Sequence, residues 1–110
     1  MNGSLLPKRK VIRIKSFDYS SERAYFVTIC TNNKENFFTN LDLGKSIVDI
    51  LRSYSEKMKY KVYVFCFMPN HIHLLINPSD SKVSISRFIG GFKSLATKAA
   101  WKFNIKGRLW

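Results

Sequence analysis

The sequence predicts an α+β domain of the split β-α-β, or ferredoxin-like, type, in which one antiparallel sheet carries two helices on one face. Three observations predict this fold class. The order of patterns along the chain is strand, helix, strand, strand, helix. The length of 110 residues suits a single hydrophobic core. The composition, 45% apolar and 15% aromatic, is that of a folded globular protein. The second face of such a sheet would be free to bind a partner.

The first strand and the first helix are predicted from composition and periodicity. Residues 24–31 are rich in β-branched and aromatic residues, which is typical of a strand. Residues 32–36 are polar and predict a loop, which we interpret as a hairpin leading into two phenylalanines. Residues 43–59 predict a helix. Its apolar face recurs at spacings of four, three and four residues in Ile47, Leu51, Tyr54 and Met58.

Two consecutive strands are expected next. Residues 62–68 have no polar face and predict a central strand covered on both sides. Pro69 and Asn70 end this strand, because proline lacks a backbone donor and asparagine favours turns. Residues 71–77 then return as a neighbouring strand.

A second helix is predicted from about Ser84 to Asn104, where apolar residues form one long stripe. Gly90 and Gly91 lie in its middle, where glycine is unfavourable, so we expect close packing or a local bend there. Residues 107–110 predict the opening of a further strand.

Basic residues are concentrated near the two ends of the chain. The net charge is +12, from 19 basic and 7 acidic residues, and residues 1–17 and 81–110 contain no acid. We divide the chain into a basic N-terminal arm, residues 1–17, and a folded domain, residues 18–110. Such a charge favours a nucleic acid over an acidic membrane as the partner. The candidate DNA contacts are Lys8, Arg9, Lys10, Arg13, Lys15, Arg87, Lys93 and Lys98.

The sequence predicts a cytoplasmic protein that is not associated with a membrane. It contains neither the apolar core of a signal peptide nor an uncharged apolar stretch long enough to span a bilayer. Cys30 and Cys66 lie in apolar runs without a Cys-x-x-Cys pair. We interpret them as two buried strand cysteines of a reducing compartment.

His71 and His73 are the sharpest chemical feature. Residues two apart in a strand point to the same face, so both imidazoles would project together while Ile72 points the other way. Two such nitrogens can supply two ligands to a divalent metal. The alternative is a pair of partly exposed strand histidines without a ligand. A histidine-triad hydrolase is excluded because the third position is Leu75, and a mononuclear zinc hydrolase would need a further ligand.

Four segments together resemble a known family. They are Asp18-Tyr19-Ser20, AYFVTICT at residues 24–31, FCFMPNHIH at residues 65–73 and FIGGFKS at residues 88–94. They strongly resemble the HUH single-tyrosine transposases, and most of all the REP-associated, insertion-sequence-200-like type. The resemblance extends from about residue 11 to residue 110.

The resemblance implies a metal-dependent DNA transposase of mobile elements. His71 and His73 would bind Mg²⁺ or Mn²⁺, which polarises the scissile phosphate of single-stranded DNA. A tyrosine would attack and leave a 5′-phosphotyrosine and a free 3′-hydroxyl, so that the strand can be rejoined elsewhere. The family binds imperfect DNA hairpins beside the cut, and the basic arm and the Lys93 face would hold their phosphates.

The sequence departs from the family at its C-terminal end. The family's nucleophile lies on a helix after the fourth strand, followed four residues on by a Gln or Asn that completes the metal site. Both positions would lie beyond Trp110. All five tyrosines precede the histidines: Tyr19, Tyr25, Tyr54, Tyr60 and Tyr63. We therefore assign no catalytic residue and expect a C-terminally truncated transposase domain that binds DNA without cleaving it.

Two alternatives stay open. The chain could be a non-catalytic ferredoxin-like module for RNA or single-stranded DNA, with Phe65 and Phe67 stacking bases. It could also act as a monomer or as a homodimer, and an exposed strand edge near the apolar residues Leu109 and Trp110 favours self-association.

Overall fold

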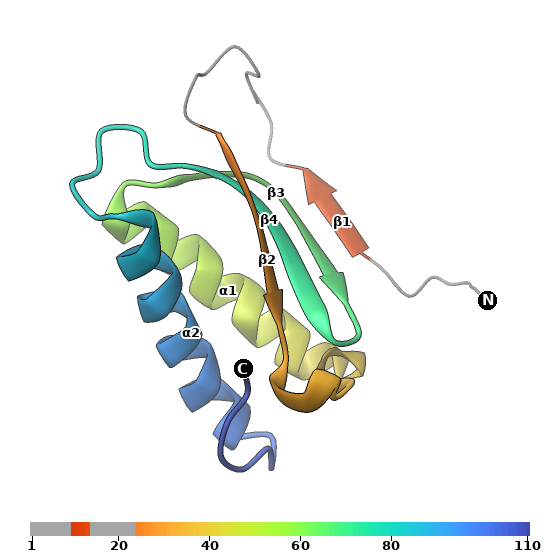
Figure 1. Cartoon of the computed structure of the whole chain (residues 1–110). Helices are drawn as coiled ribbons and strands as arrows, with labels where there is room; N and C mark the ends of the chain where they lie inside the picture. The colour runs from red at the N-terminus through yellow and green to blue at the C-terminus, as the bar shows by residue number, and fades with distance from the viewer. Residues whose placement is uncertain (1–9, 14–23) are drawn as a thin grey trace.

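In the computed structural model, which describes residues 10–13 and 24–110, four strands form one antiparallel sheet in the order β1-β3-β4-β2. The strands are β1 (Lys10–Arg13), β2 (Tyr25–Cys30), β3 (Lys61–Met68) and β4 (His71–Asn77), and the helices are α1 (Leu41–Met58) and α2 (Ile85–Trp101). Both helices lie side by side on one face of the sheet (Figure 1). The predicted split β-α-β class, with two helices on one face, is confirmed.

The hairpin of β3 and β4 forms the centre of the sheet. Pro69 and Asn70 make its turn, and the register pairs Cys66 with His73 and Phe67 with Ile72. The other side of β4 pairs with β2. Every second residue of β4 faces the helices and is fully buried: Ile72, Leu74 and Ile76. The residues between them therefore face the opposite side, which neither α1 nor α2 covers.

Each helix starts at a side-chain cap. The Asn40 Oδ1 atom accepts hydrogen bonds from the backbone N–H groups of Asp42 and Leu43, which α1 cannot satisfy internally. The Ser84 hydroxyl oxygen accepts a hydrogen bond from the backbone N–H of Arg87 at the start of α2. These caps place the starts of both helices close to the predicted positions.

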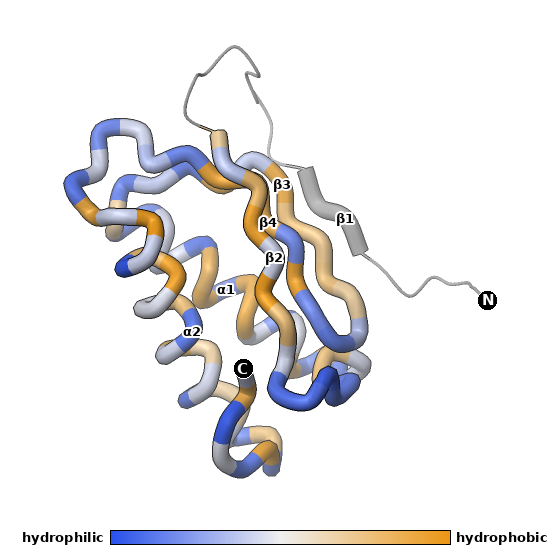
Figure 2. Tube along the Cα trace, viewed as in Figure 1, coloured by the Kyte–Doolittle hydropathy of each residue, from blue (hydrophilic) through white to orange (hydrophobic). Residues whose placement is uncertain are grey.

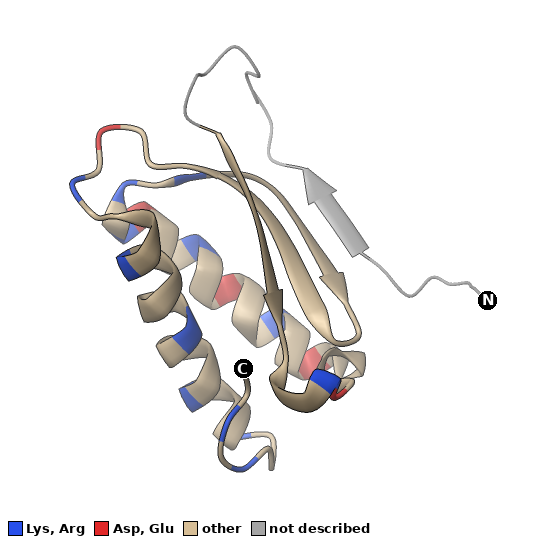
Figure 3. Ribbon diagram, in the orientation of Figure 1, with Lys and Arg blue, Asp and Glu red and all other residues tan. Residues whose placement is uncertain are grey.

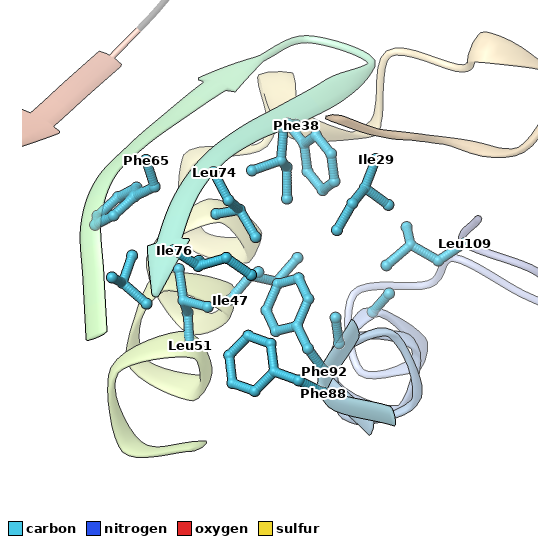
Figure 4. Close-up of a cluster of buried hydrophobic side chains, with 14 of the residues drawn as sticks. Ile29, Phe38, Ile47, Leu51, Phe65, Leu74, Ile76, Phe88, Phe92 and Leu109 are labelled. Atoms are coloured by element: carbon cyan, nitrogen blue, oxygen red, sulfur yellow. The ribbon is translucent and has the colours of Figure 1, made fainter. Parts of the chain in front are cut away.

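The core lies between the helices and one face of the sheet (Figure 4). Phe88 and Phe92 of α2 project into it, and the Phe88 ring stacks on Tyr60 at a centroid distance of 4.0 Å. Apolar residues run along the sheet strands and along the helix faces that meet them (Figure 2). Phe65 and Cys66 of β3 are both buried although neighbours in a strand face opposite sides, so the prediction that this strand is covered on both sides holds there.

Two predicted local structures are wrong. Residues 32–36 do not form a hairpin, because two short 3-10 helices, Asn32–Lys34 and Phe37–Thr39, carry the chain from β2 to α1. Residues 107–110 do not open a strand. Leu109 instead is buried in the core, and its carbonyl accepts a hydrogen bond from the backbone N–H of Asn32.

Two further expectations are corrected in part. Cys66 is buried as predicted, but Cys30 is exposed, because it pairs with His71 and lies on the face of β2 that neither α1 nor α2 covers. Residues 10–13 of the basic arm form a strand paired with β3, and the rest of that arm lies outside the described residues. The division into arm and domain stays a prediction. Within the described ranges, no helix is both long and apolar enough to cross a membrane.

Candidate metal centre and nucleic-acid interface

The histidine pair lies on the uncovered face of the sheet. Ile72 is buried in the core between His71 and His73, so the alternation of β4 turns both imidazoles outward, as the sequence predicts. The two ring centroids are 4.7 Å apart and the ring planes are 82° from parallel. Both side chains are half-buried. A rigid central strand therefore places two imidazoles side by side without ordering a loop.

A neighbouring side chain holds the Nδ1 atom of each histidine. The Asn70 Oδ1 atom lies 2.8 Å from Nδ1 of His71, and the Thr28 hydroxyl oxygen lies 3.0 Å from Nδ1 of His73. Because Oδ1 is an acceptor, His71 donates from Nδ1 and its Nε2 atom carries the lone pair. The hydroxyl of Thr28 can fix the same tautomer on His73 by accepting. Such outer contacts orient metal-binding histidines and leave the second ring nitrogen for the ion.

The electrostatics also favour a neutral His71. Its partial burial, and then the charge that His73 can carry beside it, lower the pKa of His71 below the ordinary histidine value. Neutral imidazole is the form that binds metals. His71 therefore stays ready for an ion at neutral pH.

A hollow of about 270 Å³ opens beside His71. It is lined by Thr28, Cys30, Lys34, Asn70 and His71. The first of the two 3-10 helices carries Lys34 to its rim, with Asn33 and Lys34 both in the left-handed region at φ 54° and 55°. The buried Thr31 fixes this loop to the strand turn, because its backbone N–H donates to the carbonyl of Asn70 and its hydroxyl lies within hydrogen-bond distance of the carbonyls of Glu35 and Asn70. A lysine thus stands beside the histidine pair.

An exposed aromatic ring borders the pair on the other side. Phe26 of β2 stacks on His73, with ring centroids 5.3 Å apart and planes 18° from parallel. The side chain of Phe26 is 68% exposed. Phe26, His73, His71 and the rim of the hollow thus follow one another in this order across the uncovered face.

The predicted basic residues of α2 are not gathered at the histidines. Arg87, Lys93 and Lys98 belong to the helix layer, on the other side of the sheet from the histidine pair (Figure 3). Lys8, Arg9 and Lys15 lie outside the described residues. Lys10 and Arg13 belong to β1 at the sheet edge, opposite Phe67 and Val64 of β3. Which of these residues contact DNA stays a prediction.

The two aromatic residues suggested for base stacking are in the wrong place for it. Phe65 is buried among the core residues, and Phe67 packs against the same core from the same strand face. Both rings therefore face the helices and not the uncovered face, since residues two apart share a strand face.

Sequence reasoning missed four residues of this site: Phe26, Thr28, Lys34 and Asn70. Asn70 could have been found, because it directly precedes His71 in a turn and its short amide can reach back. Thr28 lies 45 residues from His73, and only the register of β2 against β4 brings them together. The same register brings Phe26 to His73. The position of Lys34 depends on the irregular loop after β2.

The described ranges contain no group of three or more His, Cys, Asp or Glu side chains arranged to hold a metal ion. Cys30 lines the hollow opposite His71 but does not complete such a group. In the described part of the chain, the histidine pair would therefore supply two ligands at most.

Comparison with known proteins identifies the family of this fold and site. The family model described as "Transposase IS200 like" matches residues 19–110, which include both histidines, β2 to β4 and both helices. The chain belongs to this transposase family, as the resemblance implies.

One curated relative is an uncharacterised protein of Haemophilus influenzae. It is 32% identical over 77 residues, which cover 62% of this chain and 43% of the relative. The chain thus corresponds to less than half the length of that relative.

Proposed function

We propose that this chain binds single-stranded or hairpin DNA on the uncovered face of its sheet, through a divalent ion held by His71 and His73. One observation carries the proposal: each of two adjacent strand imidazoles is held at Nδ1 by a neighbouring side chain, so that Nε2 is the ring nitrogen that can face an ion, in a chain of a transposase family. The ion is Mg²⁺ or Mn²⁺, as expected for this family.

The residues present suit such an ion. Mn²⁺ and Mg²⁺ prefer oxygen ligands, which water and phosphate would supply, and the two imidazoles would complete the coordination, more readily for Mn²⁺ than for Mg²⁺. A bound ion would polarise a phosphate as a Lewis acid. The chain keeps His71 neutral by burial and fixes both rings through Asn70 and Thr28. Two protein ligands leave room for the nucleic acid itself.

Lys34 and the overall charge would supply the phosphate contacts. Lys34 is one of the residues that line the hollow beside His71, so its ammonium group could reach a phosphate bound there. With a net charge of +12, the chain also attracts a polyanion at long range. The basic residues of α2 would contact DNA that extends beyond the histidine face, such as the duplex part of a hairpin.

Cleavage of the family's type needs a tyrosine oxygen that bonds to the 5′-phosphate while the 3′-hydroxyl leaves. Between residues 24 and 110, no tyrosine lines the hollow. Tyr54, Tyr60 and Tyr63 make hydrogen bonds to Arg87, Val83 and Asn77. Tyr25 belongs to the strand face opposite Phe26. We therefore propose that the chain binds DNA, and that it cuts and rejoins DNA only with a nucleophile from outside these residues.

A Mn²⁺ titration tests the proposal. A fluorescent DNA hairpin with a single-stranded flank is mixed with the wild type, with the double variant His71→Ala/His73→Ala, and with Ser53→Ala as a control on the exposed surface of α1. We expect Mn²⁺ to strengthen DNA binding by the wild type and by Ser53→Ala but not by the double variant. Equal Mn²⁺ responses in all three proteins would overturn the metal site and favour a plain nucleic-acid-binding module.

We also propose a homodimer, which would form at one edge of the sheet. In the described part of the chain, β2 is an edge strand that pairs only with β4, and an unpaired edge can accept a second chain. The expected strand edge near Leu109 and Trp110 does not support a dimer, since Leu109 is buried and the Trp110 indole N–H donates to the Lys93 carbonyl. Sedimentation that shows only monomers at high protein concentration would overturn the dimer.

A further inference from the structure

Phe26 is the most exposed large apolar side chain among the described residues, and it borders the candidate metal centre. It is 68% exposed, whereas the ring beside it, His73, is half-buried. Large apolar side chains on open strands promote aggregation, so edge strands usually carry charge or proline instead. The exposed Phe26 ring is therefore suited to contact a partner that has a flat, apolar face.

The surroundings of Phe26 define the chemistry of that partner. One neighbour is the His73 imidazole, stacked at 5.3 Å, and the His71 ring follows at 4.7 Å. The hollow with Lys34 at its rim lies beyond His71. An aromatic ring therefore adjoins a site for an ion and a phosphate. A nucleotide has this combination of groups, a flat base next to a phosphate.

We propose that Phe26 is the stacking platform for an unpaired nucleobase of the nucleotide whose phosphate lies at the histidine pair. The inference rests on the proposed function and adds to it the residue that selects single strands, because a base within a duplex has no free face to offer. Base stacking on an aromatic ring is tolerant of base identity. Phe26 thus supports binding of single strands irrespective of sequence and orients the strand across β4.

The register of the sheet explains why this position suits the role. Phe26 lies opposite Leu75, two residues along β4 from His73, and Thr28 lies opposite His73 itself. The residue that orients His73 and the residue that would hold the base are therefore adjacent on the same face of β2. The base platform and the ion site share one rigid pair of strands.

The test measures binding of a short oligothymidylate in the presence of Mn²⁺ by fluorescence anisotropy. The variants are Phe26→Ala, Phe26→Leu and Phe26→Trp, and the matched control is Leu41→Ala, which removes a side chain of nearly equal exposure (67%) from the start of α1. We expect the Kd to rise about fivefold to a hundredfold for Phe26→Ala and Phe26→Leu. Phe26→Trp keeps an aromatic face and should bind within about twofold of the wild type, as should Leu41→Ala.

Oligothymidylates with one abasic nucleotide, moved along the strand, locate the contact. The wild type should lose affinity at one particular position relative to the labelled end, and Phe26→Ala should lose no further affinity there, because the two changes remove the same contact. If the abasic nucleotide lowers the affinity of Phe26→Ala as much as that of the wild type, so that the two losses add, the stacking role is overturned.

The outcomes separate the two proposals. If the wild type binds with Mn²⁺, the histidine variant does not, and Phe26→Ala binds like the wild type, the inference on Phe26 is wrong and the proposed function stands. If Phe26→Ala changes only the sedimentation of the protein, the ring belongs to a contact between copies of the chain and the inference is wrong. A wild type that binds no oligonucleotide overturns both.

Discussion

His71 and His73 have the same role in the candidate site, but the chain orients them by different means. His71 is held by Asn70, its neighbour in sequence, and His73 by Thr28 on the adjacent strand. The first contact forms with the turn, whereas the second requires that β2 and β4 pair in the observed register. Both contacts are made at Nδ1, so Nε2 is the ring nitrogen that each histidine can turn toward a shared ion.

Removing the outer contacts should weaken metal binding without removing a ligand. We expect Thr28→Val and Asn70→Ala each to lower the affinity for Mn²⁺ about tenfold to a hundredfold, as is typical when a histidine loses its orienting partner. Calorimetric titration with Mn²⁺ measures the change. Thr28→Ser keeps the hydroxyl and serves as the control. Unchanged Mn²⁺ affinity in Thr28→Val would show that His73 needs no orientation.

The lowered pKa of His71 gives a pH dependence of stability with a definite sign. In the unfolded chain, His71 takes up a proton near the ordinary pKa of about 6.5. In the folded protein, burial and then His73 lower the pKa of His71, so the unfolded state binds the proton first. The contribution of His71 is therefore complete above the unfolded pKa and is lost as the pH falls toward the folded pKa.

Urea unfolding at neutral pH and at mildly acidic pH checks this prediction. The wild type should lose more stability on acidification than His71→Gln, whose side chain does not titrate. The two proteins are compared because other groups titrate in both. Parallel losses in the two proteins would contradict the assignment to His71.

The elements differ in how tightly they are packed, and α2 shows this most clearly at its two central glycines. A methyl group added at Gly91 would overlap the hydroxyl of Tyr54 on α1, whereas one added at Gly90 would meet nothing within 4 Å. Of the two expected explanations, close packing therefore applies to Gly91, where it lets α1 and α2 approach each other. Gly90 has no comparable neighbour.

The pair Gly90→Ala and Gly91→Ala provides a matched test at this helix contact. Gly90→Ala should stabilise the protein by about 0.5–1 kcal/mol, because alanine is the better helix former and the space is open. Gly91→Ala should destabilise it by about 1–3 kcal/mol through overpacking. Thermal unfolding followed by circular dichroism measures both. Equal shifts in the two variants would mean that Tyr54 moves aside freely.

Composition and periodicity in the sequence predict β2, β3, β4 and both helices, but they do not predict β1. The strand predicted at residues 71–77 matches β4 in full. Apolar residues at every second position along this segment are typical of a strand with one buried face. Residues 32–36 were misjudged, because their conformation depends on Asn33 and Lys34 in the left-handed region and on bonds from Thr31 to residues far along the chain. Local composition contains no such information.

The same limit applies to the site. His71 and His73 follow from a spacing of two along one strand. Phe26 and Thr28 follow only from the pairing of β2 with β4, whose residues are more than 40 positions apart. A register can be deduced only once the whole sheet is known, so these two residues could not be assigned from one strand pattern.

At the scale of the whole molecule, charge is distributed over both layers while the candidate chemistry is confined to one. The helix layer carries Arg87, Lys93 and Lys98 on α2, and Lys34 lines the hollow beside His71. A net charge of +12 predicts DNA binding that weakens with salt, since each neutralised phosphate releases counterions.

Salt titration separates a local contact from this general attraction. Lys34→Ala should reduce the slope of log affinity against log salt by about one unit, as expected for the loss of one phosphate contact. Lys57→Ala, an exposed change near the end of α1, should leave the slope nearly unchanged. An unaltered slope in Lys34→Ala would place the phosphate elsewhere.

The alternation along β4 also makes the histidine pair part of the cooperative unit of the protein. Ile72 and Leu74 fill the core, so a slip of β4 by one residue would expose both and turn both imidazoles inward. Hydrogen exchange of the backbone amides at residues 71–73 should therefore require opening of the entire domain and not a local fluctuation. An incoming strand of DNA would meet imidazoles already in position before it arrives, and binding would require no ordering of the strand that carries them.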